Sequence, residues 1–375
     1  MSDEVLIVGY SGRAAAGSAR RAGVTPIIVD CFADRDTAAY CEVYKCPPEH
    51  FPHGLLPIIE KMPKRPVIFT GGMEHEPELI EAIRGPSPLT TSYVNFVKKV
   101  RDVQSLQSCQ PRPMRDVLYP ANFSTKAAVP HGVEVLEKPF KSGGGRGIHK
   151  SQGENPKSGT YLQEFIPGTP MSMSFRSARD DGDNHHFPIV RQLSGCEWLH
   201  GSNFEYCGNI CHRTVSEIPE CFRDLLDYKN SLEKDLNCRL LWGIDFIYRD
   251  QVIHITEVNP RYPASIEVLE HTHGVAILSH DIKYNVPPGI VGKAIWYAPF
   301  DLIVPESAAF DEAVAVAADP WALPMFADIP HVGERIAKGT PVVTILTRQA
   351  DEDAVMVELK RKAANLDELF EGCRA

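Results

Sequence analysis

The chain opens with short apolar runs that alternate with one helical stretch. Residues 5–9 form an apolar run that ends in a glycine, and residues 27–30 form a second such run. Between them, residues 12–22 are rich in Ala and Arg, which predicts a helix. Residues 67–70, followed by two glycines, have the pattern of a further strand of the same sheet. Strand, glycine turn, helix and strand in this order predict a doubly wound α/β layer.

The pattern changes after this layer. Prolines are frequent over residues 86–130, around one helical stretch at 92–108, which indicates a linker and the start of a new unit. Strand-like segments at 133–138 and 160–166 then flank a glycine-rich loop. The last part of the chain has the pattern of short strands and turns, closed by a helix at 351–371.

Composition excludes several classes of function. The 375 residues carry a formal net charge of −10 at pH 7, which repels phosphate backbones and anionic lipids, so no nucleic-acid partner is expected. No apolar run approaches the ~18 residues of a membrane helix, and the acidic start is unlike a secretory signal. The ten cysteines form no CxxC pair and are interpreted as reduced thiols. We therefore expect a cytoplasmic protein without a membrane partner.

The first predicted strand ends in a turn that suggests a pocket. The sequence Gly9-Tyr-Ser-Gly12 lacks the GxGxxG fingerprint of a dinucleotide site. Ligands nevertheless bind beyond the carboxyl ends of strands in such sheets. Candidate substrate residues are therefore Ser11, Gly12, Arg13 and Glu74; the alternative is a set of tight turns with a solvated Glu.

The glycine-rich loop is a candidate phosphate site. Four glycines lie within residues 143–147, directly after the strand that ends near Lys138. Bare backbone N–H groups in such a loop can close on a phosphate chain, and a fixed ammonium can meet the same phosphates. The GxxxxGK[ST] motif is absent, and a mobile hairpin is the alternative. The next strand ends in Pro167-Gly168 and offers an apolar slot for an adenine ring, or is simply an edge strand.

Acidic side chains occur on the strand pair expected at 240–248 and 252–258. Because side chains alternate along a strand, Glu257 and Asn259 project to the same face. Asp245 lies between two apolar residues, where an unpaired carboxylate is costly. A divalent cation would neutralise both acids, since carboxylate and amide oxygens suit Mg²⁺. A salt-bridged or surface set is the alternative.

The connection between these strands decides whether the acids share a face. With a three-residue connection at 249–251, Asp245 faces Ile255 and Glu257 is its diagonal neighbour, roughly 7–8 Å away. With a two-residue turn, Asp245 faces His254 and the acids lie on opposite faces. A metal site at Asp245 and Glu257 therefore requires the three-residue connection or a bulge.

The order of these segments resembles the ATP-grasp superfamily. Lys on a strand, a glycine loop, a strand ending in Pro-Gly, Gly243-x-Asp-Phe and Glu257-Val-Asn-Pro-Arg261 follow one another in the chain, and the resemblance covers residues 90–285. It implies an N-terminal α/β domain at 1–90, a two-lobed ATP-grasp domain at 91–290 with a lobe boundary near 165, and a small β-rich part at 291–375.

The resemblance also implies roles for individual residues. Lys138 is expected to contact the ATP phosphates, and Arg261 to steady the transferred phosphoryl group. One or two Mg²⁺ ions, with Mn²⁺ as the alternative, are expected on Asp245, Glu257 and Asn259. Further ATP-binding candidates in the loop and at the hinge are Lys141, Gly143, Gly144, Gly145, Arg146, Gly147, Gln163, Glu164, Phe165 and Ile166. The residue that replaces the family's additional lysine before the first lobe, and the one that binds ribose, stay open.

The implied activity is ligation. Members of the superfamily activate a carboxylate with ATP and let an amine or a thiol attack it. The chain looks most like small carboxylate–amine ligases of the tyramine–glutamate ligase type, which implies a role in methanofuran and tetrahydromethanopterin one-carbon metabolism and a homodimer. A non-catalytic nucleotide-binding module and a small-molecule kinase are the alternatives.

Overall fold

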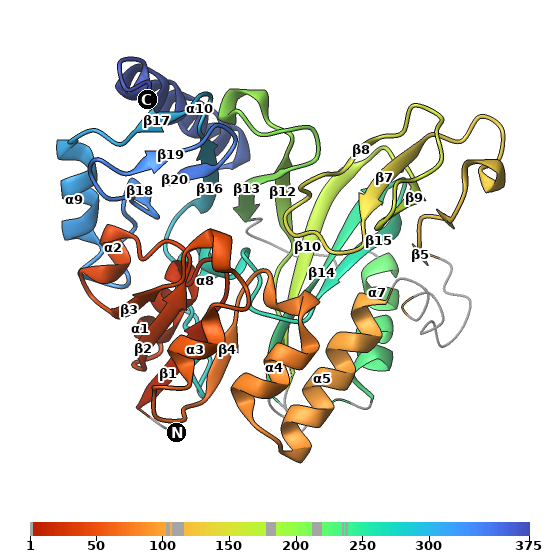
Figure 1. The fold of residues 1–375 in the computed structure, drawn as a ribbon, viewed down its shortest axis with the longest axis horizontal. Helices are drawn as coiled ribbons and strands as arrows, with labels where there is room; N and C mark the ends of the chain where they lie inside the picture. The colour runs from red at the N-terminus through yellow and green to blue at the C-terminus, as the bar shows by residue number, and fades with distance from the viewer. Residues whose placement is uncertain are drawn as a thin grey trace.

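A computed structural model describes residues 3–102, 106, 116–177, 185–211, 220–234, 236 and 239–375. Figure 1 shows the N-terminal layer (red) below the C-terminal part (blue), and the segment carrying β7, β8 and β9 on the opposite side of the molecule. In the described parts of the chain, no helix is both long and apolar enough to cross a membrane.

The N-terminal layer is a four-stranded parallel sheet with the order β3-β2-β1-β4. Val5 and Ile7 pack against helix α1, whereas Leu6 and Val8 pack against α3 and α4. Helices therefore cover both faces of the sheet, which confirms the predicted α/β layer. Its elements are β1 (Glu4–Val8), α1 (Arg13–Arg21), β2 (Thr25–Asp30), α2 (Arg35–Ala38), β3 (Glu42–Lys45), α3 (Leu55–Ile59), β4 (Val67–Phe69) and α4 (Pro77–Arg84).

Helix α5 (Pro88–Arg101) leads from this layer to the rest of the chain. It begins four residues before the predicted start, because the Ser87 side chain accepts a hydrogen bond from the Thr90 backbone N–H at 3.1 Å and Pro at the first helical position is preorganised for a helix. Residues 103–105, 107 and 108 of the predicted helix lie outside the described residues.

A small antiparallel sheet follows, with the order β6-β9-β7-β8. The predicted glycine-rich loop joins β7 to β8. The chain then passes into the large sheet between β9 and β10, at residues 165–168. The strands are β6 (Asn122–Phe123), β7 (Val135–Pro139), β8 (His149–Lys150) and β9 (Thr160–Glu164).

The large sheet has the order β18-β20-β16-β13-β12-β10-β14-β15-β5, with β11 paired to β10. The C-terminal strands β16, β20 and β18 thus extend this sheet rather than form one of their own. Its strands are β5 (Val117–Leu118), β10 (Thr169–Ser177), β11 (His185–His186), β12 (Val190–Ser194), β13 (Tyr206–Cys211), β14 (Leu240–Arg249), β15 (Val252–Asn259), β16 (Ile290–Tyr297), β18 (Phe326–Ala327) and β20 (Pro341–Gln349).

Helices fix the large sheet in place. Helices α5 and α7 pack on the β14 and β15 end, α8 lies between the large sheet and α1, and α9 and α10 cover β16 and β20. The remaining elements are α7 (Glu220–Glu233), α8 (Ile266–His273), β17 (Leu302–Ile303), α9 (Ala308–Val316), β19 (Arg335–Ile336, paired with β17) and α10 (Glu352–Phe370).

The β14–β15 hairpin meets the condition for the two acids to share a face, through a bulge and not through a three-residue connection. The connection is a two-residue turn, since Arg249 pairs with Val252 and both turn residues, Asp250 and Gln251, have positive φ. Such turns match the twist of the strands, so of the two connections considered, the two-residue turn is the one present. The register then shifts between Phe246 and Asp245, which leaves Thr256 as a bulge.

Candidate active site

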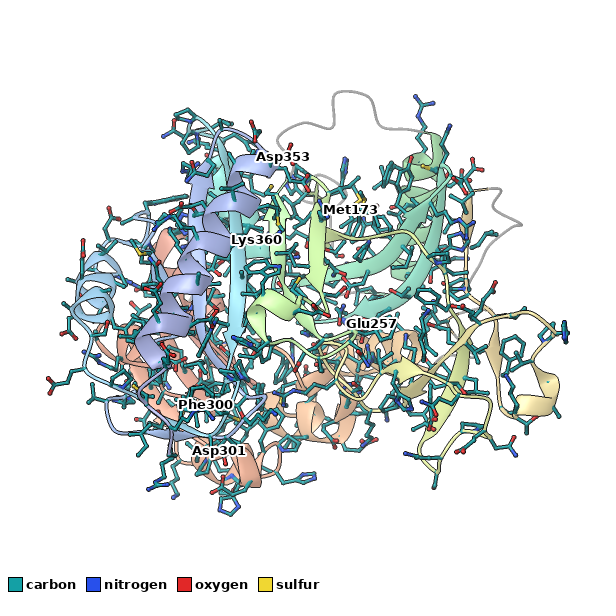
Figure 2. The ribbon with its side chains drawn as sticks, turned by 90° about the horizontal axis from the view of Figure 1, so that it is seen from above. Met173, Glu257, Phe300, Asp301, Asp353 and Lys360 are labelled. Carbon is teal, nitrogen blue, oxygen red and sulfur yellow. The ribbon has the colours of Figure 1, made fainter. Side chains whose placement is uncertain are left out.

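A cavity of about 230 Å³ lies between the small sheet and the large sheet. We call it the central cavity. Figure 2 shows Glu257 near the middle of the molecule, next to the segment that carries the small sheet. The walls include most residues that the sequence singles out: Lys138, Gly144, Gly145, Gln163, Glu164, Phe165, Ile166, Asp245, Glu257, Asn259 and Arg261.

Two carboxylates share one wall of the central cavity. Because of the bulge at Thr256, Asp245 lies directly opposite Glu257. The Asp245 carboxylate accepts hydrogen bonds from Gln192 Nε2 at 2.9 Å and Asn259 Nδ2 at 2.8 Å. Burial and the neighbouring Glu257 raise the pKa of Asp245 to about 7. Holding a second negative charge at this position is costly unless a cation joins the pair.

Glu257 is held by a residue that sequence reasoning did not assign. Arg101, the last residue of α5, donates from Nη1 to Glu257 Oε1 at 2.5 Å. Burial opposes ionisation of Glu257, but Arg101 and Lys138 outweigh it and lower its pKa. Helical spacing could have indicated that Arg101 faces inward, because it follows the buried Val97 by four residues and so lies on the same face.

Lys138 lies on β7 at the opposite wall. Its Nζ donates to Gln163 Oε1 at 3.0 Å, and burial lowers the pKa of the ammonium group. Glu257 and Asp245 are close enough to act against that shift. The central cavity therefore sets the ammonium group of Lys138 against two carboxylates, and an anionic ligand that brings its own cation would complement both.

Arg261 joins the central cavity to the N-terminal layer. Its Nε donates to Glu74 Oε1 at 3.1 Å, and its Nη2 donates to Asn259 Oδ1 at 3.1 Å. Glu74 is fully buried, and its Oε2 has no hydrogen-bond partner among the residues that the structure describes. Arg261 is thus positioned from two sides while it lines the wall.

The glycine loop bends over the cavity. The Gly144 carbonyl accepts a hydrogen bond from the Tyr206 backbone N–H at 2.8 Å. Gly145 has φ +73°, and a Cβ there would lie 2.0 Å from the Phe204 carbonyl oxygen. Only glycine fits this close approach. Four of the predicted ATP-binding residues do not line the central cavity. Lys141 pairs with Glu76, Arg146 pairs with Glu205, Gly147 packs against Pro139, and Gly143 lines a neighbouring cavity instead.

A second cavity of about 400 Å³ adjoins the first, with Gly144, Tyr206 and Arg261 shared between them. We call it the lateral cavity. Its walls come from the carboxyl ends of β1, β2 and β4, the glycine loop, and the C-terminal strands. They comprise Tyr10, Ser11, Phe32, Asp34, Phe51, Gly71, Gly72, Glu74, Gly143, Gly144, Arg146, Glu205, Tyr206, Arg261, Ile295, Tyr297, Asp328, Pro341, Val342, Val343 and Thr344.

Only two of the four candidate substrate residues line the lateral cavity. Ser11 and Glu74 line the lateral cavity, whereas Gly12 and Arg13 do not. The Gly12 N–H donates to Asp30 Oδ2 at 2.8 Å, and a Cβ on Gly12 would strike Ile28. Arg13 forms ion pairs with Glu267 and Asp328. Its guanidinium group therefore links the N-terminal layer to α8 and to the C-terminal part, and it does not face a ligand.

Several lining residues of the lateral cavity were missed. Tyr10, Phe32 and Asp34 follow the carboxyl ends of strands. Ser11 was predicted because ligands bind beyond such ends, and the same reasoning applies to these three residues. That rule, extended to β2, finds Phe32 and Asp34. No local pattern marks Asp328 or Tyr297, which arrive from the C-terminal part.

The donor chemistry of the central cavity fits a divalent cation bound partly by ligand oxygens. The described residues hold no group of three or more His, Cys, Asp or Glu side chains able to hold a metal ion. Two carboxylates and the amide of Asn259 leave further coordination positions to oxygens from outside the protein. Mg²⁺ is commonly bound by one or two carboxylates together with phosphates.

Comparison with known proteins identifies the fold. Residues 104–265 match the sequence family described as the ATP-grasp domain. No curated protein sequence matches the chain.

Solved structures resemble nearly the whole chain. The L-amino acid ligase of Bacillus licheniformis has a TM-score of 0.64 at 14% identity, over 96% of this chain and 97% of that one. The N5-carboxyaminoimidazole ribonucleotide synthetase of Thermus thermophilus has a TM-score of 0.60 at 15% identity, over 97% and 98%. The biotin carboxylase domain of the Hydrogenobacter thermophilus 2-oxoglutarate carboxylase, solved with MgADP and bicarbonate, has a TM-score of 0.64 at 13% identity, over 97% and 90%. The protein therefore has the predicted two-lobed ATP-grasp fold.

Proposed function

We propose that the protein is an ATP-dependent, ADP-forming ligase that activates a small carboxylate as an acyl phosphate and couples it to an amine. The observation that carries this proposal is the convergence of Lys138, Asp245, Glu257, Asn259 and Arg261 on one cavity. Lys138 comes from β7 and Asp245 from β14, and they meet the end of β15 and the turn after it only in the fold. Nucleotide binding alone does not require so many charged groups at one place.

The wall of the central cavity divides into parts that match the parts of ATP. The segment Gln163–Ile166, where the chain leaves the small sheet, is proposed to line the adenine ring. Lys138 and the backbone of Gly144 and Gly145 are proposed to meet the phosphates, because an ammonium group and exposed N–H groups neutralise phosphate charge. Arg146 and Lys141 have carboxylate partners in the structure, and their contact with ATP would require a shift of the loop.

Mg²⁺ is proposed to lie on Asp245, Glu257 and Asn259, with Mn²⁺ as an alternative. Burial and the neighbouring Glu257 raise the pKa of Asp245, and a cation bound beside this carboxylate would offset both effects. When bound, the ion supplies charge neutralisation to the phosphates. Arg101 fixes the position of Glu257, and it brings a positive charge to the place where the family's additional lysine is expected.

The proposed reaction has two steps. A carboxylate oxygen attacks the γ-phosphorus of ATP, the bond to the bridging oxygen breaks, and ADP leaves. The amine nitrogen then attacks the acyl carbon, phosphate leaves, and the surplus proton of the amine passes to solvent. Arg261 is proposed to steady the transferred phosphoryl group, a role supported by its position in the walls of both cavities. Positioning and charge neutralisation suffice for such a transfer.

Narrower assignments rest on the sequence alone. They are the three-domain division at 1–90, 91–290 and 291–375, the tyramine–glutamate ligase type with its one-carbon role, the homodimer, and the cytoplasmic location. The large sheet runs across the second of these boundaries, so the last two parts are proposed to move as one body.

The test is ADP release with panels of carboxylates and amines, in ATP and MgCl₂, followed by mass spectrometry of the amide. We expect a carboxylate–amine pair that raises ADP release above background, and a loss of about 100-fold or more in Glu257→Gln. Glu134→Gln is the matched control, because Glu134 is 63% exposed and pairs with Lys150 at the surface. Its rate should equal that of the wild type.

Hydroxylamine separates the competing functions. A ligase gives a hydroxamate when hydroxylamine replaces the amine, and the amide when the amine is present. Release of the acyl phosphate as the final product would indicate a kinase. Mg²⁺-dependent nucleotide binding without ADP formation across the panel would indicate a non-catalytic binding module, and either outcome overturns the proposal.

A further inference from the structure

A third cavity, of about 250 Å³, lies between the N-terminal layer and the large sheet. We call it the edge cavity, because its walls include β4, the outer strand of the N-terminal sheet. The end of α4, the end of β10 and the start of β14 complete the walls. The edge cavity is slightly larger than the central cavity, at about 230 Å³, and the proposed reaction does not use it. It is therefore a candidate site for a second ligand.

The charged residues that line the edge cavity are mostly cationic. Four are arginines and one is a glutamate: Arg84, Arg176, Arg239, Arg261 and Glu4. The Glu4 carboxylate accepts a hydrogen bond from Arg65 Nε at 2.7 Å, and Arg65 does not line the cavity. The walls thus carry an excess of positive charge, which attracts an anionic ligand.

Two of these arginines are held in fixed positions. Arg84 lies over the Tyr93 ring, with 5.2 Å between its guanidinium carbon and the ring centroid, and it has no carboxylate partner among the residues that the structure describes. Arg176 is buried, and its Nη1 donates to the carbonyl oxygens of Ile277 at 2.8 Å and Ser279 at 2.5 Å. These contacts orient both guanidinium groups, and neither an aromatic ring nor a carbonyl carries a full negative charge.

The rest of the edge cavity is largely apolar. Its other lining residues are aliphatic or aromatic, with Val67, Leu241 and Leu278 among them. Arg239 is exposed, and its Nη1 donates to His280 Nδ1 at 3.0 Å, so the wall reaches the solvent at this residue. An apolar space beside fixed positive charges favours a ligand with an anionic head and a hydrocarbon body.

The edge cavity is connected to the central cavity through the segment around Arg261. Arg261 itself lines both cavities. The Tyr93 hydroxyl donates to the Pro260 carbonyl at 2.7 Å, and the Tyr262 N–H donates to the Phe69 carbonyl at 2.9 Å. Because Tyr93 and Phe69 belong to the wall of the edge cavity, the backbone on both sides of Arg261 is attached to that wall.

We propose that the edge cavity is an effector site for a carboxylate with a hydrocarbon body, and that its occupant weakens nucleotide binding in the central cavity. The proposal goes beyond the ligase function, since ligation needs no ligand at this place. The carboxylate head would attract Arg261, whose positive charge the phosphates in the central cavity also need. Coupling between two binding sites is reciprocal, so the nucleotide would weaken binding of the carboxylate by the same factor.

The site is tested first by calorimetry without nucleotide. The probes are octanoate, the neutral octanamide, and acetate, which lacks the hydrocarbon body. We expect octanoate to bind the wild type at least about tenfold more tightly than either other probe. In Arg84→Gln, the preference for octanoate over octanamide should fall about fivefold or more, because one of the fixed charges is removed.

Two further variants make this result decisive. Arg239→Gln should also reduce the preference for octanoate over octanamide, and because Arg239 is exposed, it reads the site independently if Arg84→Gln does not fold. Arg361→Gln is the control, since Arg361 is 55% exposed and pairs with Glu358 on α10. It should bind all three probes as the wild type does.

The coupling is tested by repeating the octanoate titration with saturating MgADP. We expect octanoate to bind about fivefold more weakly than without nucleotide, and MgADP to bind more weakly by the same factor in saturating octanoate. Tyr93→Phe keeps the ring under Arg84 and removes the hydroxyl that holds Pro260. In this variant the coupling factor should fall to near one, while octanoate binding without nucleotide stays within about twofold of the wild type.

Each outcome bears on a separate claim. Absence of octanoate binding, equal binding of octanoate and octanamide, or an unchanged preference in both Arg84→Gln and Arg239→Gln would overturn the effector site. Octanoate binding that is lost in Lys138→Met but unchanged in Arg84→Gln would place the anion in the central cavity and overturn it as well. Octanoate affinity that does not depend on MgADP would overturn the coupling. Failure of MgADP to bind would instead contradict the proposed ligase function, and with it the coupling, and leave the anion site standing.

Discussion

Asp245 and Glu257 lie directly opposite each other on antiparallel strands because Thr256 is bulged out of the register. Without the bulge, a two-residue turn would put the two acids on opposite faces of the sheet. The Thr256 hydroxyl donates to the Asp245 carbonyl at 3.1 Å, which fastens the bulge. Bulges commonly re-aim a side chain at a functional site.

Because the two acids lie side by side, removing one charge should stabilise the ligand-free protein and weaken the binding of Mg²⁺ with its ligand. Asp245→Asn removes one of two like charges and keeps one acceptor oxygen for Asn259, while the Gln192 amide can turn its own oxygen towards the new NH2 group. We expect the ligand-free protein to gain about 1 kcal/mol in free energy of unfolding, and to lose the Mg²⁺-dependent part of its stabilisation by ADP. Thermal unfolding with and without MgADP measures both. Asp250→Asn, in the turn of the same hairpin and 84% exposed, should change neither; a destabilised Asp245→Asn would contradict the prediction.

The two lysines near the glycine loop should behave differently. Lys138 is half-buried in the wall of the central cavity, and Lys141 is 68% exposed and pairs with Glu76. Lys138→Met should weaken MgATP binding about 10- to 100-fold, because a hydrogen bond to a charged group contributes ~1.5–3 kcal/mol. Lys141→Met should stay within about twofold. Calorimetric titration with a non-hydrolysable ATP analogue checks this, and equal losses in both variants would refute the assignment of Lys138.

The loop itself can be tested with two alanines. At Gly145, φ is +73° and a Cβ would strike the Phe204 carbonyl, whereas a Cβ at Gly143 meets nothing within 4 Å. Left-handed backbone costs a non-glycine residue ~1–2 kcal/mol, so Gly145→Ala should raise the KM for ATP about tenfold. Gly143→Ala should leave the KM unchanged. Steady-state kinetics decides, and a similar KM in both variants would show that the close approach is unimportant.

Glu74 should make the protein sensitive to acid. Burial by itself raises the pKa of Glu74, but Arg261, Arg101 and His75 outweigh it and lower the pKa to about 2. Because this value is below that of the unfolded chain, about 4.3, the ion pair stabilises the fold above that pH. The contribution is lost as the pH falls from about 4 towards 2.

Glu74→Gln measures this contribution. The variant should be less stable than the wild type by about 3 kcal/mol at pH 7, and the difference should shrink steadily below pH 4. Urea unfolding at several pH values gives the difference directly. Glu78→Gln serves as the control, since Glu78 is 77% exposed and pairs with Lys98. A difference that does not change with pH would mean that packing, not charge, is lost.

The local pattern predicted seven of the strands and one shared face. Apolar runs marked β1, β2, β4, β7, β9, β14 and β15, because a buried strand needs apolar side chains whatever surrounds it. Alternation placed Glu257 and Asn259 on one face. It could not choose between a longer connection and a bulge, since both change the parity of pairing in the same way.

Contacts between residues far apart in the sequence could not be predicted from it. Arg13 is a plausible ligand residue from its place after β1, but Glu267 and Asp328 arrive from α8 and the C-terminal part and neutralise it. Arg101 and Glu257, 156 residues apart, gave no joint signal. The same holds for Arg13 and Asp34: Arg13 pairs with Glu267 and Asp328, and no described cation pairs with Asp34.

The sequence by itself determined the order of strands and loops and the residue types that suit phosphate and a divalent cation, because these follow from the period of the backbone and the chemistry of single side chains. The tertiary structure decided which charges are compensated: Glu74 by Arg261, Glu257 by Arg101, and Asp34 by no described residue. Burial makes an unpaired charge costly, and burial exists only after the sheets and helices have packed. The charges that remain uncompensated therefore determine which charged groups a ligand must carry.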